Sequence, residues 1–186
     1  IGNPLKLILL FSLPVLFGNL FQQFYNMVDT IIVGQFLGED ALAAVGATGS
    51  IMFLVLGFAS GLAQGFGVMV SQAFGAKDES RLKHIVALSF LLTIIISVVL
   101  TALTVTTSRE LLIFMNTPDN IFADAYSYIM IIIAGIVANI FYNLLSAFLR
   151  AVGNSKVPLF FLVFSACLNV VLDILFVVKI QMGVAG

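Results

Sequence analysis

Residues 7–34 read LILLFSLPVLFGNLFQQFYNMVDTIIVG, and this stretch decides the class of fold. Its single charged residue is Asp29. A helix needs about 20 apolar residues to cross the hydrocarbon core of a bilayer. The apolar residues are continuous rather than alternating, which argues against a β-barrel strand. Because a backbone in lipid must satisfy its own hydrogen bonds, this stretch is predicted to be a transmembrane helix.

The rest of the chain repeats this pattern. The 186 residues are 61% hydrophobic and 9% charged, whereas soluble domains carry about 25% charged residues. We therefore predict an all-α membrane protein, a bundle of transmembrane helices. The five helices are expected at about residues 5–36, 41–74, 82–107, 118–150 and 157–179.

Composition also excludes several functions. The net charge of −1 argues against nucleic-acid binding, which requires a basic patch. The single cysteine, Cys167, excludes an intrachain disulfide and a cysteine-cluster metal site. The sequence contains no HExxH, GxSxG or phosphate-binding loop. We therefore expect neither an enzyme nor a cofactor.

Basic residues orient the predicted bundle. More of them flank one end than the other, and the positive-inside rule then places the N-terminus in the cytoplasm. The chain starts at Ile1 and stops shortly after a hydrophobic run, so truncation at both ends is expected. The basic residues at the predicted cytoplasmic end are Lys6, Lys77, Arg81, Lys83, Arg150 and Lys156, against Arg109 and Lys179 at the other.

Two spans contain residues with conformational consequences. Gly57, Gly61 and Gly65 repeat every four residues, and such a row lets another helix backbone approach closely. Pro14 lies inside the first span, where it removes a hydrogen bond and favours a bend. The predictions are a packing face in the second helix and a hinge in the first.

Polar residues form a stripe on the first predicted helix. Asn19, Gln22, Asn26 and Asp29 are spaced 3, 4 and 3 apart, which places them on one face. The amides fit hydrogen bonding between helices as well as a cavity lining. An aspartate at the centre of a span costs about 2.5–3.5 kcal/mol, so Asp29 indicates a functional site unless it lies at the solvated outer interface.

The fifth predicted helix supplies a second carboxylate. Asn169 and Asp173 are four residues apart on one face. From a rise of about 1.5 Å per residue, both lie in the outer half of the membrane, as do Asp29 and Tyr128. These four residues are predicted to share a cation-coupling site unless their depths coincide by accident.

Two carboxylates in a poorly hydrated pocket disfavour double ionisation. Such a pair can take up a proton, or it can hold Na⁺ together with an amide oxygen. The candidate Na⁺ ligands are Asp29, Asp173 and Asn169, and the residues leave the choice between H⁺ and Na⁺ open.

A second polar face occurs on the fourth predicted helix, where Asn139, Asn143, Ser146 and Arg150 are spaced 4, 3 and 4 apart. Arg150 is expected to extend to the cytoplasmic interface. The candidate residues for a substrate cavity, for which helix packing remains an alternative role, are Gln22, Asn26, Gln64, Asn139 and Asn143.

The chain resembles the multidrug and toxic compound extrusion (MATE) transporters. The resemblance lies in residues 13–46 (LPVLFGNLFQQFYNMVDTIIVGQFLGEDALAAVG), 61–78 (GLAQGFGVMVSQAFGAKD), 116–131 (NTPDNIFADAYSYIMI), 144–158 (LLSAFLRAVGNSKVP) and 168–177 (LNVVLDILFV). The five blocks occur in order and span essentially the whole chain, which makes them specific together.

This resemblance implies two six-helix lobes that alternate between inward-open and outward-open states. The chain would be five helices of the N-terminal lobe, with the C-terminal lobe absent. The family's carboxylates in the C-terminal lobe are absent too, so the coupling ion stays open. The residues that match the family's functional positions are Pro14, Gln22, Asp29, Tyr128, Asn169 and Asp173.

The leading hypothesis is a secondary antiporter of the bacterial inner (plasma) membrane. It would export drugs or organic cations in exchange for H⁺ or Na⁺, with the bilayer and the absent half of the polypeptide as partners. A lipid-linked oligosaccharide flippase is the first alternative, disfavoured because no arginine or lysine lies well inside a span. The second alternative is a non-transporting membrane subunit, in which the polar stripe only joins helices.

Overall fold

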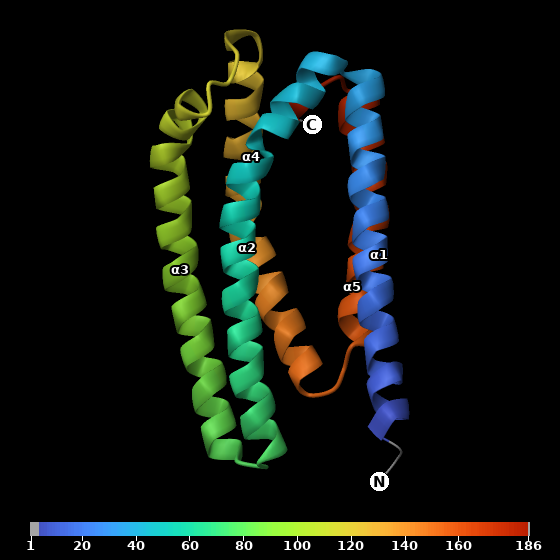
Figure 1. The fold of residues 1–186 in the computed structure, drawn as a ribbon, viewed down its shortest axis with the longest axis vertical. Coiled ribbons are helices and arrows are strands. Elements are labelled where there is room, and N and C mark those ends of the chain that lie inside the picture. Colours follow the sequence, from blue (N-terminus) through green and yellow to red (C-terminus); the bar gives the residue numbers. More distant parts are fainter. Residues whose placement is uncertain (1–3, 186) are drawn as a thin grey trace.

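The computed structural model describes residues 4–185, all of whose regular secondary structure is helical (Figure 1). The prediction of an all-helical membrane protein is confirmed, because five helical segments are long and apolar enough to cross a membrane. The elements are α1 (Pro4–Phe36), α2 (Glu39–Gly75), α3 (Glu79–Phe114), α4 (Asp119–Ala151), α5 (Lys156–Asp173), the π-helix η1 (Ile174–Lys179) and the 3₁₀ turn η2 (Gly183–Ala185).

Three helices lie within two residues of their expected bounds, and the third and fifth depart further from expectation. The third helix was expected to end at residue 107, but α3 continues to Phe114. Residues 108–114 contain no glycine or proline, and the chain leaves the helix at Asn116, which has a φ of 53°. The fifth helix changes from α to π geometry after Asp173. A π-helical turn inside an α-helix often accompanies a functional site.

The helices form two groups (Figure 1). In the first group α2 packs mainly against α4 and also against α3, which in turn contacts α4. In the second group α1 packs along α5. Contacts between the groups are sparser, and they join α4 to η2, α1 to α2 and α4 to α5. The two-helix group therefore lies beside a more tightly packed three-helix group.

The main core lies in the three-helix group. On α4, Ile129, Ile133, Ile136 and Ile140 are at most 3% exposed. Their spacing of 4, 3 and 4 residues places them on one helix face. This face packs against apolar residues of α2 that include Ile51. The α2–α4 contact fixes one wall on which functional residues can be positioned.

Within residues 4–185, no other helix packs against the glycine row predicted as a packing face of the second helix. No described atom lies within 4 Å of a Cβ built at Gly57, Gly61 or Gly65. A different small-residue row packs towards α4, two residues further along α2. It consists of Ala59, Ala63 and Gly67, all buried.

The second helix thus has two small-residue rows on nearly opposite faces, and the one that packs against α4 was not predicted. Residues two apart are rotated by about 200° in an α-helix. Lipid and protein partners are both apolar, so composition does not distinguish the faces. At Gly67 a Cβ would lie 3.2 Å from the Cβ of Ala147 and 3.3 Å from its carbonyl oxygen. The close contact of α2 with α4 at this position therefore favours glycine.

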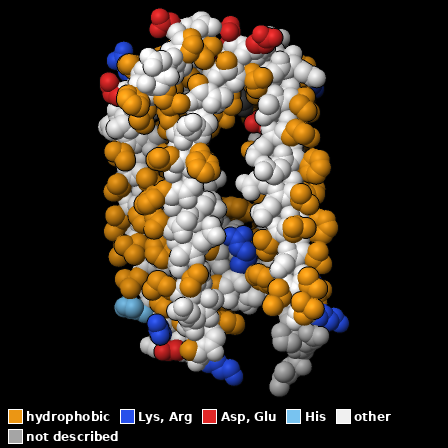
Figure 2. Space-filling view, viewed as in Figure 1, with side chains coloured by type: hydrophobic (Ala, Val, Ile, Leu, Met, Phe, Trp, Pro, Cys, Tyr) orange, Lys and Arg blue, Asp and Glu red, His pale blue; other side chains and the backbone are white. Residues whose placement is uncertain are grey.

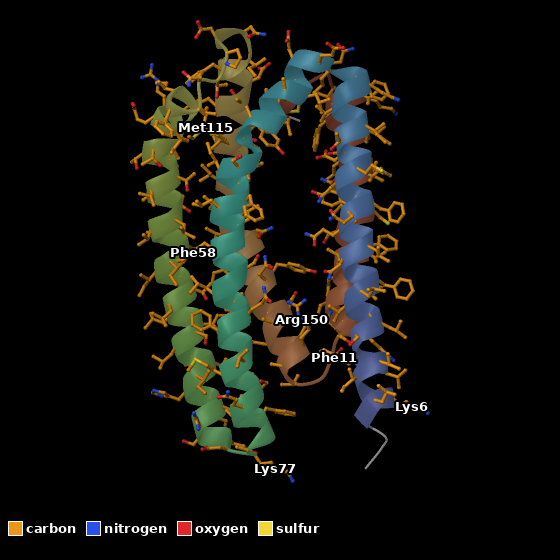
Figure 3. The ribbon with its side chains drawn as sticks, in the orientation of Figure 1. Lys6, Phe11, Phe58, Lys77, Met115 and Arg150 are labelled. Carbon is orange, nitrogen blue, oxygen red and sulfur yellow. The ribbon has the colours of Figure 1, made fainter. Side chains whose placement is uncertain are left out.

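The two ends of the bundle differ in charge. Lys6 and Lys77 lie at one end and Met115 lies at the other (Figure 3). We call the end with Lys6 and Lys77 the basic end. Acidic side chains gather at the opposite end, while orange apolar side chains cover much of the surface between them (Figure 2). An apolar girdle between two charged ends is the surface expected of a protein that spans a bilayer.

Candidate cation and substrate site

An acidic pair joins α1 to α5. Asp29 is half-buried on α1, and Asp173 is 8% exposed at the last residue of α5. Their carboxyl groups face each other within hydrogen-bonding range. Each is an acceptor when ionised, so neither carboxylate can donate a hydrogen bond to the other. Asp29 and Asp173, which residue counting predicted to lie at similar depths in the membrane, are thus neighbours in space.

Three further polar groups surround this pair. Tyr128 of α4 and Tyr25 of α1 lie close enough to both carboxyls to interact electrostatically with them. Asn169 lies one turn before Asp173 on α5. The Oδ1 atom of Asn169 and the Oδ2 atom of Asp173 are buried and accept no hydrogen bond from residues 4–185. The structure therefore places all four predicted cation-coupling residues around one point.

Sequence reasoning missed Tyr25. Its position four residues before Asp29 was the available signal, since residues four apart share a helix face. It went unnoticed because a tyrosine in a membrane span is common at the lipid interface. In the structure Tyr25 both adjoins the acidic pair and lines a cavity.

A cavity of about 490 Å³ lies between α1, α4 and α5. Tyr25 and Asn169 connect its wall to the acidic pair, whereas Asp29, Asp173 and Tyr128 do not line it. Pro14 and Gln22, both singled out from the sequence, are part of the α1 wall. The carboxylates therefore adjoin the cavity through shared neighbours.

The polar face of α4 forms another wall of this cavity. Asn139, Asn143, Ser146 and Arg150 all line it. The Nδ2 atom of Asn143 donates hydrogen bonds to the carbonyl oxygen of Asn139 at 2.9 Å and to its Oδ1 atom at 3.0 Å. Ser60 of α2 donates to the Oδ1 atom of Asn143 at 3.4 Å. These bonds orient an amide-rich surface towards the cavity.

Tyr142 ties the two helix groups together at the cavity. Its hydroxyl donates a hydrogen bond of 3.2 Å to the carbonyl oxygen of Pro158 on α5, and both residues line the cavity. A carbonyl oxygen has two lone pairs, so that of Pro158 can accept from Tyr142 in addition to a hydrogen bond within α5. Tyr142 was not predicted, because its partner on α5 can be recognised only once the helices are packed.

Two predicted cavity residues do not line this cavity. Asn26 is exposed and donates to the Oε1 atom of Gln23 at 3.5 Å. Gln64 is exposed and donates to the carbonyl oxygen of Ser60 at 3.4 Å. Asn26 shares the helix face of Asn19 and Gln22, but it lies beyond Tyr25, the last residue along α1 that lines the cavity.

Arg150 does not simply extend to the interface as expected. It is half-buried and lines the cavity. Its side chain projects from α4 into the space beside α1 and α5 (Figure 3). A basic side chain is visible at this hollow in the space-filling view (Figure 2). The expectation failed because the break at Gly153, which has a φ of 88°, returns the chain as α5 and encloses the end of α4.

Comparison with known proteins gives the family. The MatE family model matches residues 14–175. The probable multidrug resistance protein YpnP of Bacillus subtilis is 35% identical over 100% of this chain and 42% of its own length. The multidrug export protein MepA of Staphylococcus aureus is 23% identical over 97% of this chain and 40% of its own. The chain thus spans about two fifths of the length of these relatives.

Solved structures agree with this assignment. The outward-facing conformation of a multidrug resistance MATE transporter superposes with a TM-score of 0.93 at 28% identity, covering 99% of this chain and 41% of that one. A MOP superfamily transporter from Pyrococcus furiosus gives the same TM-score and identity over 99% of this chain and 40% of that one. That transporter is described with a binding pocket of reversed polarity that suggests a different function. Because the family model matches most of the chain and the helical arrangement is the same, this multi-pass membrane chain belongs to the MATE transporter family.

Proposed function

We propose that this chain forms the cation-coupling part of a secondary antiporter that exports amphipathic or cationic compounds in exchange for H⁺ or Na⁺. The observation that carries the proposal is the acidic pair of Asp29 and Asp173 beside a polar cavity. The coupling ion is a transported substrate, and the site offers it oxygen ligands from both carboxyls and from Asn169.

The unpartnered acceptors explain why a cation is needed. The Oδ2 atom of Asp173 and the Oδ1 atom of Asn169 are buried without a donor. A buried acceptor without a partner costs about 1–3 kcal/mol, and more when it is charged. A proton shared by the carboxyls would give the Oδ2 atom of Asp173 a partner. A Na⁺ ion among the oxygens would satisfy the Oδ1 atom of Asn169 as well. Binding of the cation is therefore favourable in this arrangement of α1 and α5.

Coupling to export follows from the position of α1. When the cation leaves, the two carboxylates repel each other by about 4 kcal/mol at ~4 Å and an effective dielectric of ~20. This repulsion separates α1 from α5, and α1 has few other contacts. Because Gln22, Tyr25 and Pro14 line the cavity, a movement of α1 changes its shape. Cation and substrate then favour different conformations of the same cavity.

Pro14 is proposed as the hinge for this movement. The helix is continuous across Pro14, although proline has no N–H to donate to the preceding turn. A helix that lacks one internal hydrogen bond bends more easily at that point. The hinge lies at the cavity, so bending there alters the wall directly.

The orientation is proposed from charge. The basic end carries Lys6 and Lys77 (Figure 3), and basic loops face the cytoplasm. We infer a bacterial plasma membrane location with the N-terminus inside. The acidic pair then lies nearer the outer surface and the end of α4 with Arg150 lies nearer the cytoplasm.

The test uses the full-length gene product in liposomes loaded with a fluorescent organic cation. Efflux is measured with a Na⁺ gradient alone and with a pH gradient alone, which identifies the coupling ion. Asp29→Asn removes one charge while preserving shape, and we expect gradient-driven efflux to fall at least tenfold. Asn26→Ala serves as a control for mutation of the same helix outside the cavity. Asp29→Asn with unchanged efflux would reject the proposal.

Arg150 gives the flippase alternative one favourable observation. A cationic group in the cavity wall removes the main sequence argument against recognition of a phosphate-linked substrate. The liposome assay separates the alternatives, because a flippase would translocate a lipid-linked oligosaccharide without exporting the organic cation. Failure to move either substrate would favour a non-transporting role.

A further inference from the structure

The cavity carries an unpaired positive charge that the proposed coupling mechanism does not use. Arg150 is the one charged side chain among the described residues that line it. Within residues 4–185 the recorded ion pair joins Lys83 and Glu79 on the exposed surface of α3, so no described carboxylate neutralises Arg150. A half-buried guanidinium without a counter-ion is unfavourable, and its planar donor group matches a carboxylate or phosphate.

The surrounding wall strengthens this positive end. Ser155, Pro158 and Leu159 line the cavity at the start of α5, where the helix has a partial positive charge. Ser155 is 6% exposed and provides a hydroxyl on the same wall. The amides of Asn139 and Asn143 lie further along α4. The cavity therefore offers donors, and one full charge, to an anionic group near the basic end.

The opposite end of the cavity has the reverse polarity. Asn169 lines it and belongs to the group around the Asp29–Asp173 pair. Pro158 and Asn169 are eleven residues apart on α5, which corresponds to roughly 16 Å along the helix. A drug-sized molecule fits this length and the volume of about 490 Å³. The charge pattern is positive towards the basic end and negative towards the acidic pair.

We propose that this cavity selects amphiphiles bearing both an anionic and a cationic group, and that Arg150 binds the anionic group. The ligand carries its carboxylate or phosphate at the Arg150 end and its ammonium group towards the acidic pair. A purely cationic compound has no anionic group to bind Arg150 and interacts only with the end of the cavity near the acidic pair. This inference names the substrate class of the proposed antiporter. Its transport prediction rests on that proposed function, whereas ligand binding can be measured whether or not the protein transports.

The test compares two ligands and four proteins. The ligands are a rhodamine with a free carboxylate and the ethyl ester of the same dye, which differ in the anionic group. The proteins are the full-length wild type, Arg150→Gln, Arg150→Lys and Lys156→Gln. Lys156 is exposed at the first residue of α5 and does not line the cavity, so it controls for the loss of a positive charge at the same end.

Equilibrium binding to the purified proteins is the first readout. We expect the wild type to bind the carboxylate dye more tightly than its ester. Arg150→Gln should weaken the carboxylate dye by roughly tenfold or more, as expected when a hydrogen bond to a charged group is lost, and should change ester binding less than twofold. Arg150→Lys should restore part of the preference, and Lys156→Gln should retain it. Equal weakening of both dyes in Arg150→Gln, or a wild type that does not prefer the carboxylate, would overturn the proposal.

Transport of the same dyes in liposomes is the second readout. Export of the ester but not the carboxylate dye by the wild type would overturn the substrate class while leaving the antiporter intact. Binding preference without export of either dye would support the anion subsite and reject the antiporter. Repeating the binding assay with and without phosphatidylglycerol separates the sources of the anion: a preference abolished by that lipid supports the anion subsite and assigns it to a phosphate headgroup.

Discussion

Replacing Gly67 by valine tests whether the close contact of α2 with α4 is required. A Cβ at this position would lie 3.2 Å from the Cβ of Ala147 and 3.3 Å from its carbonyl oxygen. The carbonyl belongs to the backbone of α4, so it cannot rotate away as a side chain would. Valine adds two further methyl groups to this contact. The helices must therefore separate, which typically costs about 1–3 kcal/mol for overpacking of a core.

The expected change in melting temperature follows from this cost. In domains of 150–250 residues, 1 kcal/mol corresponds to about 2–4 °C, so Gly67→Val should lower the melting temperature by about 2–12 °C. The assay is thermal unfolding of detergent-purified full-length protein, followed by the loss of the monodisperse peak in size-exclusion chromatography. Gly67→Ala should show a smaller loss, because it adds the Cβ alone.

Gly65→Val is the matched control. Gly65 lies on the same helix, is exposed, and has no described atom within 4 Å of a built Cβ. Valine has a higher helix propensity than glycine, so this variant should melt within about 2 °C of the wild type or slightly above it. Equal melting temperatures for Gly67→Val and Gly65→Val would refute the reasoning that the α2–α4 contact requires glycine.

Three further predictions concern the cavity and the acidic pair. Tyr142→Phe removes the hydroxyl that donates to the carbonyl oxygen of Pro158 at 3.2 Å and should cost about 1 kcal/mol, measured as a melting temperature lowered by a few degrees; an unchanged value would show that this bond does not hold α4 to α5. Gln22→Ala should raise the KM for an exported dye, whereas Asn26→Ala should not, because Gln22 lines the cavity and Asn26 does not; equal effects in the efflux assay would argue against the cavity as the substrate site. Asp173→Asn should abolish stabilisation by the coupling cation, which in the wild type reaches about 2.7 kcal/mol at 100 times the Kd, and persistence of that thermal shift in the variant would remove Asp173 from the cation site.

The sequence was sufficient to predict the class of fold. Long apolar runs require helices in lipid, since no other open backbone structure satisfies its hydrogen bonds there. Asp29 and Asp173 were also identifiable, because an ionised group inside a span is costly enough to need a reason. Their depth followed from residue counting at about 1.5 Å per residue, and the structure brings their carboxyls together.

Helix faces were predictable to a lesser degree. The face of α4 that carries Asn139, Asn143 and Arg150 follows from helical periodicity and lines the cavity as one surface. The small-residue row of α2 that packs against α4 was not predicted, because α2 carries two such rows and lipid is as apolar as a helix. Local spacing identifies which residues share a face, but it does not identify what that face contacts.

The surroundings of each residue were decided by tertiary structure alone. Arg150 is near the end of α4 in sequence, yet the return of the chain as α5 makes it part of a cavity wall. The hydrogen bond from Tyr142 to Pro158 likewise joins two helices whose mutual rotation no spacing specifies. Secondary structure in a membrane depends on local hydrogen bonding and composition, which the sequence states directly. Which side chains meet across helices depends on packing, and that is determined only when all the helices are in place.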